Sequence, residues 1–355
     1  MKLKLLVPII SFLLIVTILG GCLGGYISEN VNRVYLNPDG NYLISDDGNS
    51  IQFWNISSGK ELLLENHNGG VYRWSPKDDY LANNGQIRYF STMKLVANYS
   101  GSIFDWSYNG KYFISIDTSQ VNSSNIYIYE STNYSLIKNF SIDDMVRSIV
   151  ISPDGNEIIY YSYSSYYSPH MYLKVVDIAS ENVSLLFDFV IPNECDNPEA
   201  FIFNPIFSWS QNINSIGIGG LYDYQCLLIY IIDSINGSII YKKNITSSKY
   251  NNAIAFSPNN ERFIVCGPKV EIWNVSNGEK IKVISDENCV SIDWSLNGKK
   301  IVTGGLEGII KVYDAQTGEL LSSMKTKEYQ TPGFEMFIIL FAIALILFYK
   351  KIYNC

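Results

Sequence analysis

The chain has 355 residues, of which 47% are hydrophobic and only 17% are charged, a composition typical of a packed globular protein rather than a disordered one. Its 27 tyrosines favour strands. The net charge of -8 argues against nucleic acid as a partner, because binding to a phosphate backbone requires a basic face.

Residues 1–21 are typical of a secretory signal peptide, with two early lysines, an apolar run from Leu5 to Leu19 and then small residues. Cys22 stands directly after Leu-Gly-Gly, and this ending resembles a lipoprotein signal. The resemblance implies that Cys22 becomes the lipid-modified first residue. A plain signal peptide that is cleaved nearby is the alternative. Residues 22–30 then form a linker.

Seven copies of one short pattern run through residues 31–325. Each copy has an apolar residue, usually Trp, directly before Ser or Asn, and then a turn and a second apolar stretch. The copies are YLNPDGNYL from Tyr35, RWSPKDDYL from Arg73, DWSYNGKYF from Asp105, VISPDGNEI from Val150, SWSQNINSI from Ser208, AFSPNNERF from Ala255 and DWSLNGKKI from Asp293. A second pattern of strand, Ser/Asn/Gly-rich turn and strand follows every copy, as in IQFWNISSGKEL from Ile51.

One unit is therefore expected to form four short strands, named a to d in chain order. Seven such units of roughly 40 residues are the sequence signature of a β-propeller. One four-stranded sheet cannot bury both faces alone, whereas radial stacking lets each blade cover its neighbours. We predict an all-β, seven-bladed propeller with four-stranded blades. Its inter-blade core should include the recurring aromatic residues Trp74, Trp106, Trp209, Phe256 and Trp294.

These units resemble the WD-repeat family. The resemblance rests on SPDG at the a–b turn and on IWN or VYD at the end of strand c. The family's Gly-His pair is absent, and with only two histidines, His67 and His170, its His-containing network cannot form. Members of the family usually complete the last blade with an N-terminal strand. Here Gly318 to Met324 already supplies strand d of unit 7, so we expect closure by packing between blades 1 and 7.

No catalytic or metal-binding motif is recognisable in the sequence: it has no G-x-S-x-G motif, no His cluster and no Cys-x-x-Cys pair. The acidic SPDG turn is not expected to hold a cation, because Lys77 or Asn109 replaces Asp154 in copies that keep the turn. We therefore expect a binding protein without cofactor or metal. Two alternatives stay open: an envelope enzyme that acts on polysaccharide through carboxylates in the propeller channel, and a structural component of the surface layer.

Four cysteines lie within the repeats, and an exported domain permits disulfides. Cys195 lies between units 4 and 5, and Cys226 lies in the b–c connection of unit 5. Cys266 ends strand b of unit 6, and Cys289 precedes strand a of unit 7. Both pairs should meet on the face that carries the b–c and d–a connections, here called the top face. We predict the disulfides Cys195–Cys226 and Cys266–Cys289, with four buried free thiols as the alternative.

The top face also receives tyrosine-rich insertions, YYSYSSYYSPHMY from Tyr160 in unit 4 and GLYDYQC from Gly220 in unit 5. Tyr and Ser in long loops resemble the composition of antibody recognition loops. The predicted ligand-binding patch consists of Tyr163, Tyr166, Tyr167, His170, Tyr222, Asp223 and Tyr224. The alternative is that the alternating tyrosines only extend strands b and c.

Five Asn-x-Ser/Thr sequons fall at c–d turns, on the opposite or bottom face. The predicted glycosylation sites are Asn55, Asn133, Asn182, Asn236 and Asn274. Turns favour Asn and Ser in any case, so turn composition alone can produce this pattern.

Residues 326–333 are predicted to be a linker and residues 334–355 a membrane or sorting segment. The apolar run from Met336 to Tyr349 is followed by two lysines, but it is shorter than the ~20 residues that span a bilayer comfortably. The preceding Thr331 to Glu335 resembles the PGF-type C-terminal sorting signal of archaeal surface proteins. The resemblance implies that the tail is removed and the protein is transferred to a lipid. A short permanent anchor is the alternative.

Either interpretation places a monomeric propeller at the outer face of the cell membrane, where an envelope protein or a glycan would be its partner. Both ends of the propeller leave from the top face, so the tyrosine patch should face the envelope. A partner within the membrane or the surface layer suits this orientation.

Overall fold

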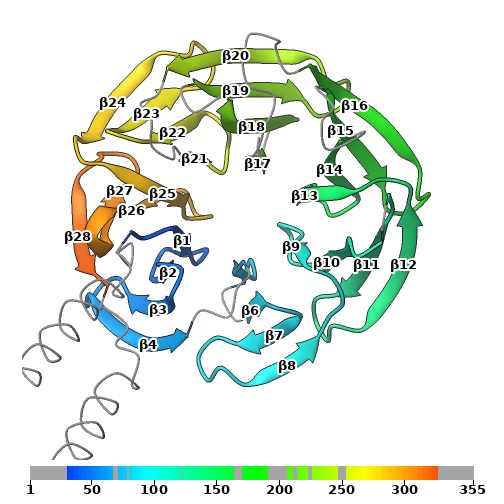
Figure 1. Cartoon of the computed structure of the whole chain (residues 1–355), viewed down its shortest axis with the longest axis horizontal. Helices are drawn as coiled ribbons and strands as arrows, with labels where there is room; N and C mark the ends of the chain where they lie inside the picture. Colours follow the sequence, from blue (N-terminus) through cyan, green and yellow to red (C-terminus); the bar gives the residue numbers. More distant parts are fainter. Residues whose placement is uncertain are drawn as a thin grey trace, which may run out of the picture.

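The computed structural model describes residues 30–66, 71–77, 80–120, 122–163, 170–190, 206–210, 214–222, 226–246 and 253–326. Within these residues the strands form seven four-stranded sheets, each built from four consecutive antiparallel strands and arranged in a ring (Figure 1). The prediction of seven four-stranded blades is confirmed. The predicted signal, residues 1–21, and the C-terminal segment, residues 334–355, lie outside the described residues. No helix within the described segments has the length and apolar character needed to cross a membrane.

Each blade contains its strands a to d in chain order. Blade 1 contains β1 (Arg33–Leu36), β2 (Tyr42–Asp46), β3 (Ser50–Asn55) and β4 (Lys60–Asn66), and blade 2 contains β5 (Arg73–Trp74), β6 (Tyr80–Asn83), β7 (Gln86–Tyr89) and β8 (Leu95–Asn98). Blade 3 contains β9 (Ile103–Trp106), β10 (Tyr112–Asp117), β11 (Ser124–Glu130) and β12 (Leu136–Ile142), and blade 4 contains β13 (Val146–Ile151), β14 (Glu157–Tyr163), β15 (His170–Asp177) and β16 (Val183–Val190). Blade 5 contains β17 (Ile206–Trp209), β18 (Ser215–Tyr222), β19 (Cys226–Asp233) and β20 (Ile239–Thr246). Blade 6 contains β21 (Ala253–Phe256), β22 (Arg262–Cys266), β23 (Val270–Asn274) and β24 (Lys280–Ser285), and blade 7 contains β25 (Cys289–Trp294), β26 (Lys300–Gly305), β27 (Ile309–Asp314) and β28 (Leu320–Lys325), with a short 3-10 turn (Leu306–Gly308) before β27.

The recurring serine of the repeat holds the a–b turn together. In blade 3 the hydroxyl of fully buried Ser107 accepts the Tyr112 N–H at 2.9 Å and donates to Asn109 Oδ1 at 2.8 Å. Gly110 takes the left-handed conformation (φ 68°) that completes the turn. Serines at the same place in blades 4, 6 and 7 form the same pair of bonds; they are Ser152, Ser257 and Ser295. The pattern seen in the sequence is therefore a hydrogen-bonding unit.

Asp154 in the SPDG turn of blade 4 has a structural role. Its carboxylate accepts bonds from the Ser152 hydroxyl at 2.6 Å and from the Asn156 side chain at 2.8 Å. The Ser152 hydrogen bond in particular lowers the pKa of Asp154. These bonds stay within the turn.

Neighbouring blades share their apolar cores, and the aromatic residue of strand a contributes to several of them. Trp106 packs with Ala82 and Ile87 of blade 2, and Trp294 packs with Ile264 and Ile272 of blade 6. Both tryptophans are buried. This arrangement confirms the expected inter-blade core.

The ring closes by packing and polar contacts between blades 1 and 7, where β25 lies beside β1 (Figure 1). Val31, which is fully buried, donates its N–H to the Gly305 carbonyl at 3.0 Å. The Ser291 hydroxyl donates to the Val31 carbonyl at 2.7 Å, and Lys300 Nζ donates to the Gly40 carbonyl at 2.7 Å. Strand d of blade 7, β28, pairs within its own sheet, as predicted.

Every outer strand d contains a β-bulge near its start, and an aliphatic residue occupies the unpaired position. The unpaired residues are Leu62, Val96, Ile137, Leu186, Ile240, Ile281 and Leu321. A bulge interrupts the row of backbone donors and acceptors that an outer strand would otherwise offer to another chain. The bulges therefore protect the seven outer edges of the ring against edge-to-edge pairing.

Candidate functional surfaces

The structure describes only part of the predicted tyrosine patch. Tyr163 ends β14, His170 begins β15, and Tyr222 ends β18. The backbone of these three residues therefore lies in strands, as the alternative of extended strands requires. The other members of the patch, Tyr166, Tyr167, Asp223 and Tyr224, lie outside the described residues.

The b–c hairpins of blades 4 and 5 extend further along the propeller axis than those of blades 6 and 7. The first pair between strands b and c at the bottom face is equivalent in these blades. It is Glu157 with Asp177 in blade 4 and Lys300 with Asp314 in blade 7. From there β14 and β15 form seven residue pairs and β18 and β19 form eight, whereas blades 6 and 7 form five each. At ~3.3 Å per residue, the two or three additional pairs raise these hairpins by about 7–10 Å on the top face.

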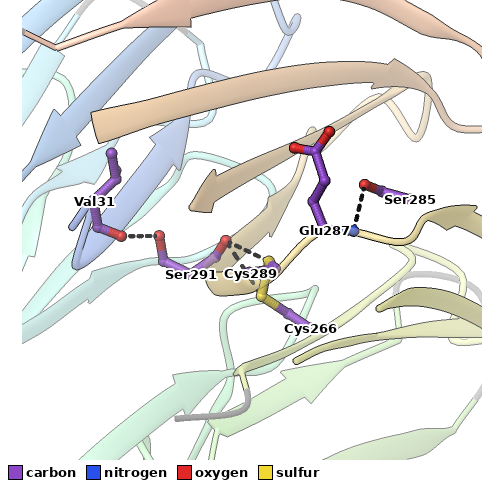
Figure 2. Close-up of a disulfide and its surroundings, with 6 residues drawn as sticks. All are labelled: Val31, Cys266, Ser285, Glu287, Cys289 and Ser291. Atoms are coloured by element: carbon purple, nitrogen blue, oxygen red, sulfur yellow. Dashed lines mark hydrogen bonds between the residues drawn. A yellow bond between two sulfur atoms is a disulfide. The ribbon is translucent and has the colours of Figure 1, made fainter. Parts of the chain in front are cut away.

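A disulfide joins Cys266 at the end of β22 to Cys289 at the start of β25, with 5.2 Å between the Cα atoms. Both cysteines are buried. Figure 2 shows the disulfide beside Ser291, whose hydroxyl holds Val31 at the seam between blades 7 and 1. The bond thus ties blade 6 to blade 7 directly next to the closure of the ring. Of the other predicted pair, Cys195 lies outside the described residues, and for Cys226 only the backbone, at the start of β19, is described.

Two carboxyl groups lie on the innermost strands of the ring. Asp105 in β9 and Asp293 in β25 each precede the tryptophan of strand a. Burial within the ring raises the pKa of Asp105, and it raises the pKa of Asp293 to about 6 against the opposing effect of the Leu36 and Trp294 N–H groups. Each of the two residues as a whole is half-buried. The nearby charge that acts on both carboxyls is the Arg73 guanidinium, which lowers both pKa values. These carboxyls therefore differ from a pair that shares one proton, in which each carboxylate raises the pKa of the other.

Within the described residues, no three His, Cys, Asp or Glu side chains are grouped so that they could hold a metal ion.

Four of the predicted glycosylation sites, Asn55, Asn133, Asn236 and Asn274, accept backbone N–H groups of their c–d turns through their side chains, whereas in blade 4 Asp177 does so in place of Asn182. The Asn55 side-chain oxygen accepts the Ser58 N–H at 3.0 Å, and that of Asn274 accepts the Ser276 N–H at 2.8 Å. Asp314 plays the same part in blade 7, where its carboxylate accepts the backbone N–H groups of the turn. Of the five sites, Asn133, Asn182 and Asn236 are exposed, whereas Asn55 and Asn274 are half-buried. For the latter two, turn formation by itself accounts for the asparagine.

Comparison with known proteins agrees with the architecture. Residues 204–330 match the family described as eukaryotic translation initiation factor eIF2A, which is less than half of the chain. The COMPASS component SWD3 of Saccharomyces cerevisiae is 36% identical over 58 residues, which cover 16% of this chain and 18% of that relative. The chain thus aligns with less than a fifth of that protein.

Among solved structures, Kuenenia stuttgartiensis hydrazine synthase superposes with a TM-score of 0.55 at 13% identity, covering 85% of this chain and 98% of that one. Identity this low shows a shared fold and nothing about function. With seven four-stranded sheets in a closed ring and these partial matches, the chain is a seven-bladed, WD40-like β-propeller.

Proposed function

We propose that the protein is a non-enzymatic interaction module that binds a protein or glycan ligand through the top face of blades 4 and 5. The observation that carries this proposal is the added height of the two neighbouring b–c hairpins. Raised hairpins on a rigid ring present side chains to a partner without strain in the ring itself. The residues between and beside these strands are rich in Tyr and Ser, which provide contact area at low cost in conformational entropy.

We further propose that this module is displayed at the outer face of the cell membrane. The support comes from the signal-like residues 1–21, from Cys22 as a lipid attachment site and from the apolar segment 334–355. The resemblance of Thr331 to Glu335 to a PGF-type sorting signal favours removal of the tail. Mass spectrometry of the mature protein from its native membrane would identify both ends and any lipid. A mature chain that still begins at Met1 would contradict export through a cleaved signal.

The test of ligand binding is crosslinking in intact cells followed by quantitative mass spectrometry. The variant Tyr166→Ser with Tyr167→Ser should lose crosslinked partners by on the order of tenfold or more, because aromatic anchors dominate interface energies. Tyr108→Ser is the matched control, since Tyr108 is 41% exposed on the a–b turn of blade 3, at the bottom face. An unchanged set of partners in the double variant would refute the proposed site.

The second candidate function is an envelope enzyme that acts on polysaccharide through the channel. The raised pKa values of Asp105 and Asp293 favour it, because general acids need such shifts. The lack of mutual influence between the two carboxyls favours the binding module. Release of reducing ends from envelope polysaccharide by the purified protein, lost in the variant Asp105→Asn with Asp293→Asn, would establish the enzyme instead.

A further inference from the structure

A groove of about 490 Å³ lies between blades 4 and 5 on the bottom face, opposite the raised b–c hairpins of these blades. The a–b turn of blade 4, from Ser152 to Glu157, forms one side, and the c–d turn of blade 5, from Ser234 to Asn236, forms the other. Leu185 and Leu186 of β16 and Trp209 of β17 complete the walls. The groove therefore combines apolar walls with two carboxylates, those of Asp154 and Glu157.

Ile235 is the first unusual residue of this groove. Its side chain is 73% exposed at the tip of the c–d turn. Small or polar residues occupy the same place in the turns of the other six blades; they are Ser57, Ser91, Thr132, Ala179, Ser276 and Gln316. The turn itself thus does not require a large apolar side chain. The exposed side chain of Ile235 does not stabilise the blade, and the repeat gives no reason for an isoleucine at this position.

Glu157 is the second unusual residue. The first residue of strand b is Tyr, Ser, Arg or Lys in the other blades, namely Tyr42, Tyr80, Tyr112, Ser215, Arg262 and Lys300. Partial burial raises the pKa of Glu157, and the negative charges of Asp154 and Asp177 raise it further. The two charges that raise the pKa of this carboxylate, those of Asp154 and Asp177, are both negative. A cation in the groove would relieve that repulsion.

A second groove, between blades 6 and 7, shows which features belong to the fold and which to this site. It has a volume of about 310 Å³ and is built from the same turns, with Trp294 in the place of Trp209. Arg262 stands there in the place of Glu157, and Gln316 in the place of Ile235. The groove therefore recurs with the repeat, and the second one also has a carboxylate, Glu261, and an aliphatic side chain, Leu296. What distinguishes the groove of blades 4 and 5 is Glu157 in the place of a cation and Ile235 in the place of a polar residue.

We propose that the groove between blades 4 and 5 binds a peptide segment of a partner protein in which a lysine or arginine stands next to a bulky aliphatic residue. The aliphatic side chain would pack on Ile235, Leu185 and the ring of Trp209. The cation would lie against the carboxylate of Glu157, and the negative charge of Asp154, whose carboxylate is bonded within the turn, would add to the attraction. Charge complementarity selects this occupant over an acidic or neutral segment. This site is independent of the proposed top-face ligand, so either can fail alone.

The probe is the acetylated and amidated peptide Leu-Lys-Leu-Lys, titrated into the full-length protein at low salt and followed by calorimetry and ligand-observed NMR. The matched peptide Leu-Glu-Leu-Glu should not bind. Glu157→Gln and Ile235→Ser should each weaken binding of the lysine peptide by about tenfold, since each removes one charge-assisted or apolar contact. Arg262→Gln, in the equivalent groove, should leave binding unchanged. None of these side chains is fully buried, so each variant should fold, and thermal melting is the measurement that checks it.

Three results would overturn the proposal. The lysine peptide fails to bind, the glutamate peptide binds equally well, or neither Glu157→Gln nor Ile235→Ser alters the affinity. A fourth refuting result would come from mass spectrometry of the native protein. Asn236 lines the groove and stands in a glycosylation sequon. It is also a predicted glycosylation site, so the two proposals compete: a glycan found on Asn236 would exclude a peptide from the groove.

Discussion

Asp293 allows a quantitative test of how burial in the ring affects a carboxyl group. Its pKa is raised from 3.8 to about 6, mainly by burial. The difference of about two units corresponds to about 3 kcal/mol at ~1.36 kcal/mol per unit, an upper value because the residue as a whole is half-buried. A folded-state pKa above the unfolded one means that the protonated form favours folding. This contribution is complete below pH 3.8 and is lost as the pH rises through 6.

The variant Asp293→Asn removes this titration and keeps an oxygen that can accept the Leu36 N–H, which now bonds the carboxylate at 2.7 Å. Relative to the wild type, the variant should therefore gain stability between pH 4 and pH 7 by up to about 3 kcal/mol. The measurement is urea unfolding of both proteins at the two pH values, followed by tryptophan fluorescence.

Asp154→Asn is the control with the opposite sign. Hydrogen bonds lower the pKa of Asp154, so its ionised form favours folding and its contribution is lost as the pH falls. The contribution is present above the unfolded-state pKa of 3.8, so the control variant should lose stability relative to the wild type as the pH rises from about 2 to 5 and should change little between pH 4 and pH 7. A difference between Asp293→Asn and wild type that is equal at both pH values would refute the reasoning, because Asp293 would then titrate as in the unfolded chain.

Two further predictions concern the seam between blades 6 and 7 and the a–b turn of blade 3. The variant Cys266→Ala with Cys289→Ala should lower the free energy of unfolding by about 3 kcal/mol, the entropy that a bond between cysteines separated by 23 residues removes from the unfolded chain. Urea unfolding with and without reductant measures this difference. A wild type whose unfolding does not respond to reductant would count against the disulfide. Ser107→Ala should lower the free energy of unfolding by about 1–3 kcal/mol, because the N–H of Tyr112 loses the buried hydroxyl that accepts it. An unchanged midpoint of urea unfolding would show that the turn does not depend on the serine.

Local hydrogen bonding explains why the fold could be predicted. Ser107 and its equivalents bond to residues only two and five positions away, so the same few letters recur wherever the a–b turn recurs. The four strands of a blade are likewise consecutive in the chain and pair through short turns. Because this local unit repeats, the number of blades can be counted in the sequence without knowledge of any long-range contact.

The candidate sites depend on contacts that the repeat does not encode. Glu157 and Ile235 belong to different blades and meet across a groove only because blades 4 and 5 stack side by side. The burial of Asp293 results from closure of the ring, which brings Leu36 from the other end of the propeller to its carboxylate. No periodicity predicts these pairs, since they join unlike residues at unrelated distances along the chain.

The sequence by itself thus determined the blade, its turns and the number of blades, because these rest on hydrogen bonds and apolar patterns within about 40 residues. It also indicated that Cys266 and Cys289 lie near each other, since the connection in which each stands defines its face of the ring. Only the tertiary structure decided which deviations from the repeat share one surface, and which carboxyl groups are buried when the ring closes. The physical reason is that blades interact through faces and turns whose partners are set by radial packing rather than by chain neighbourhood.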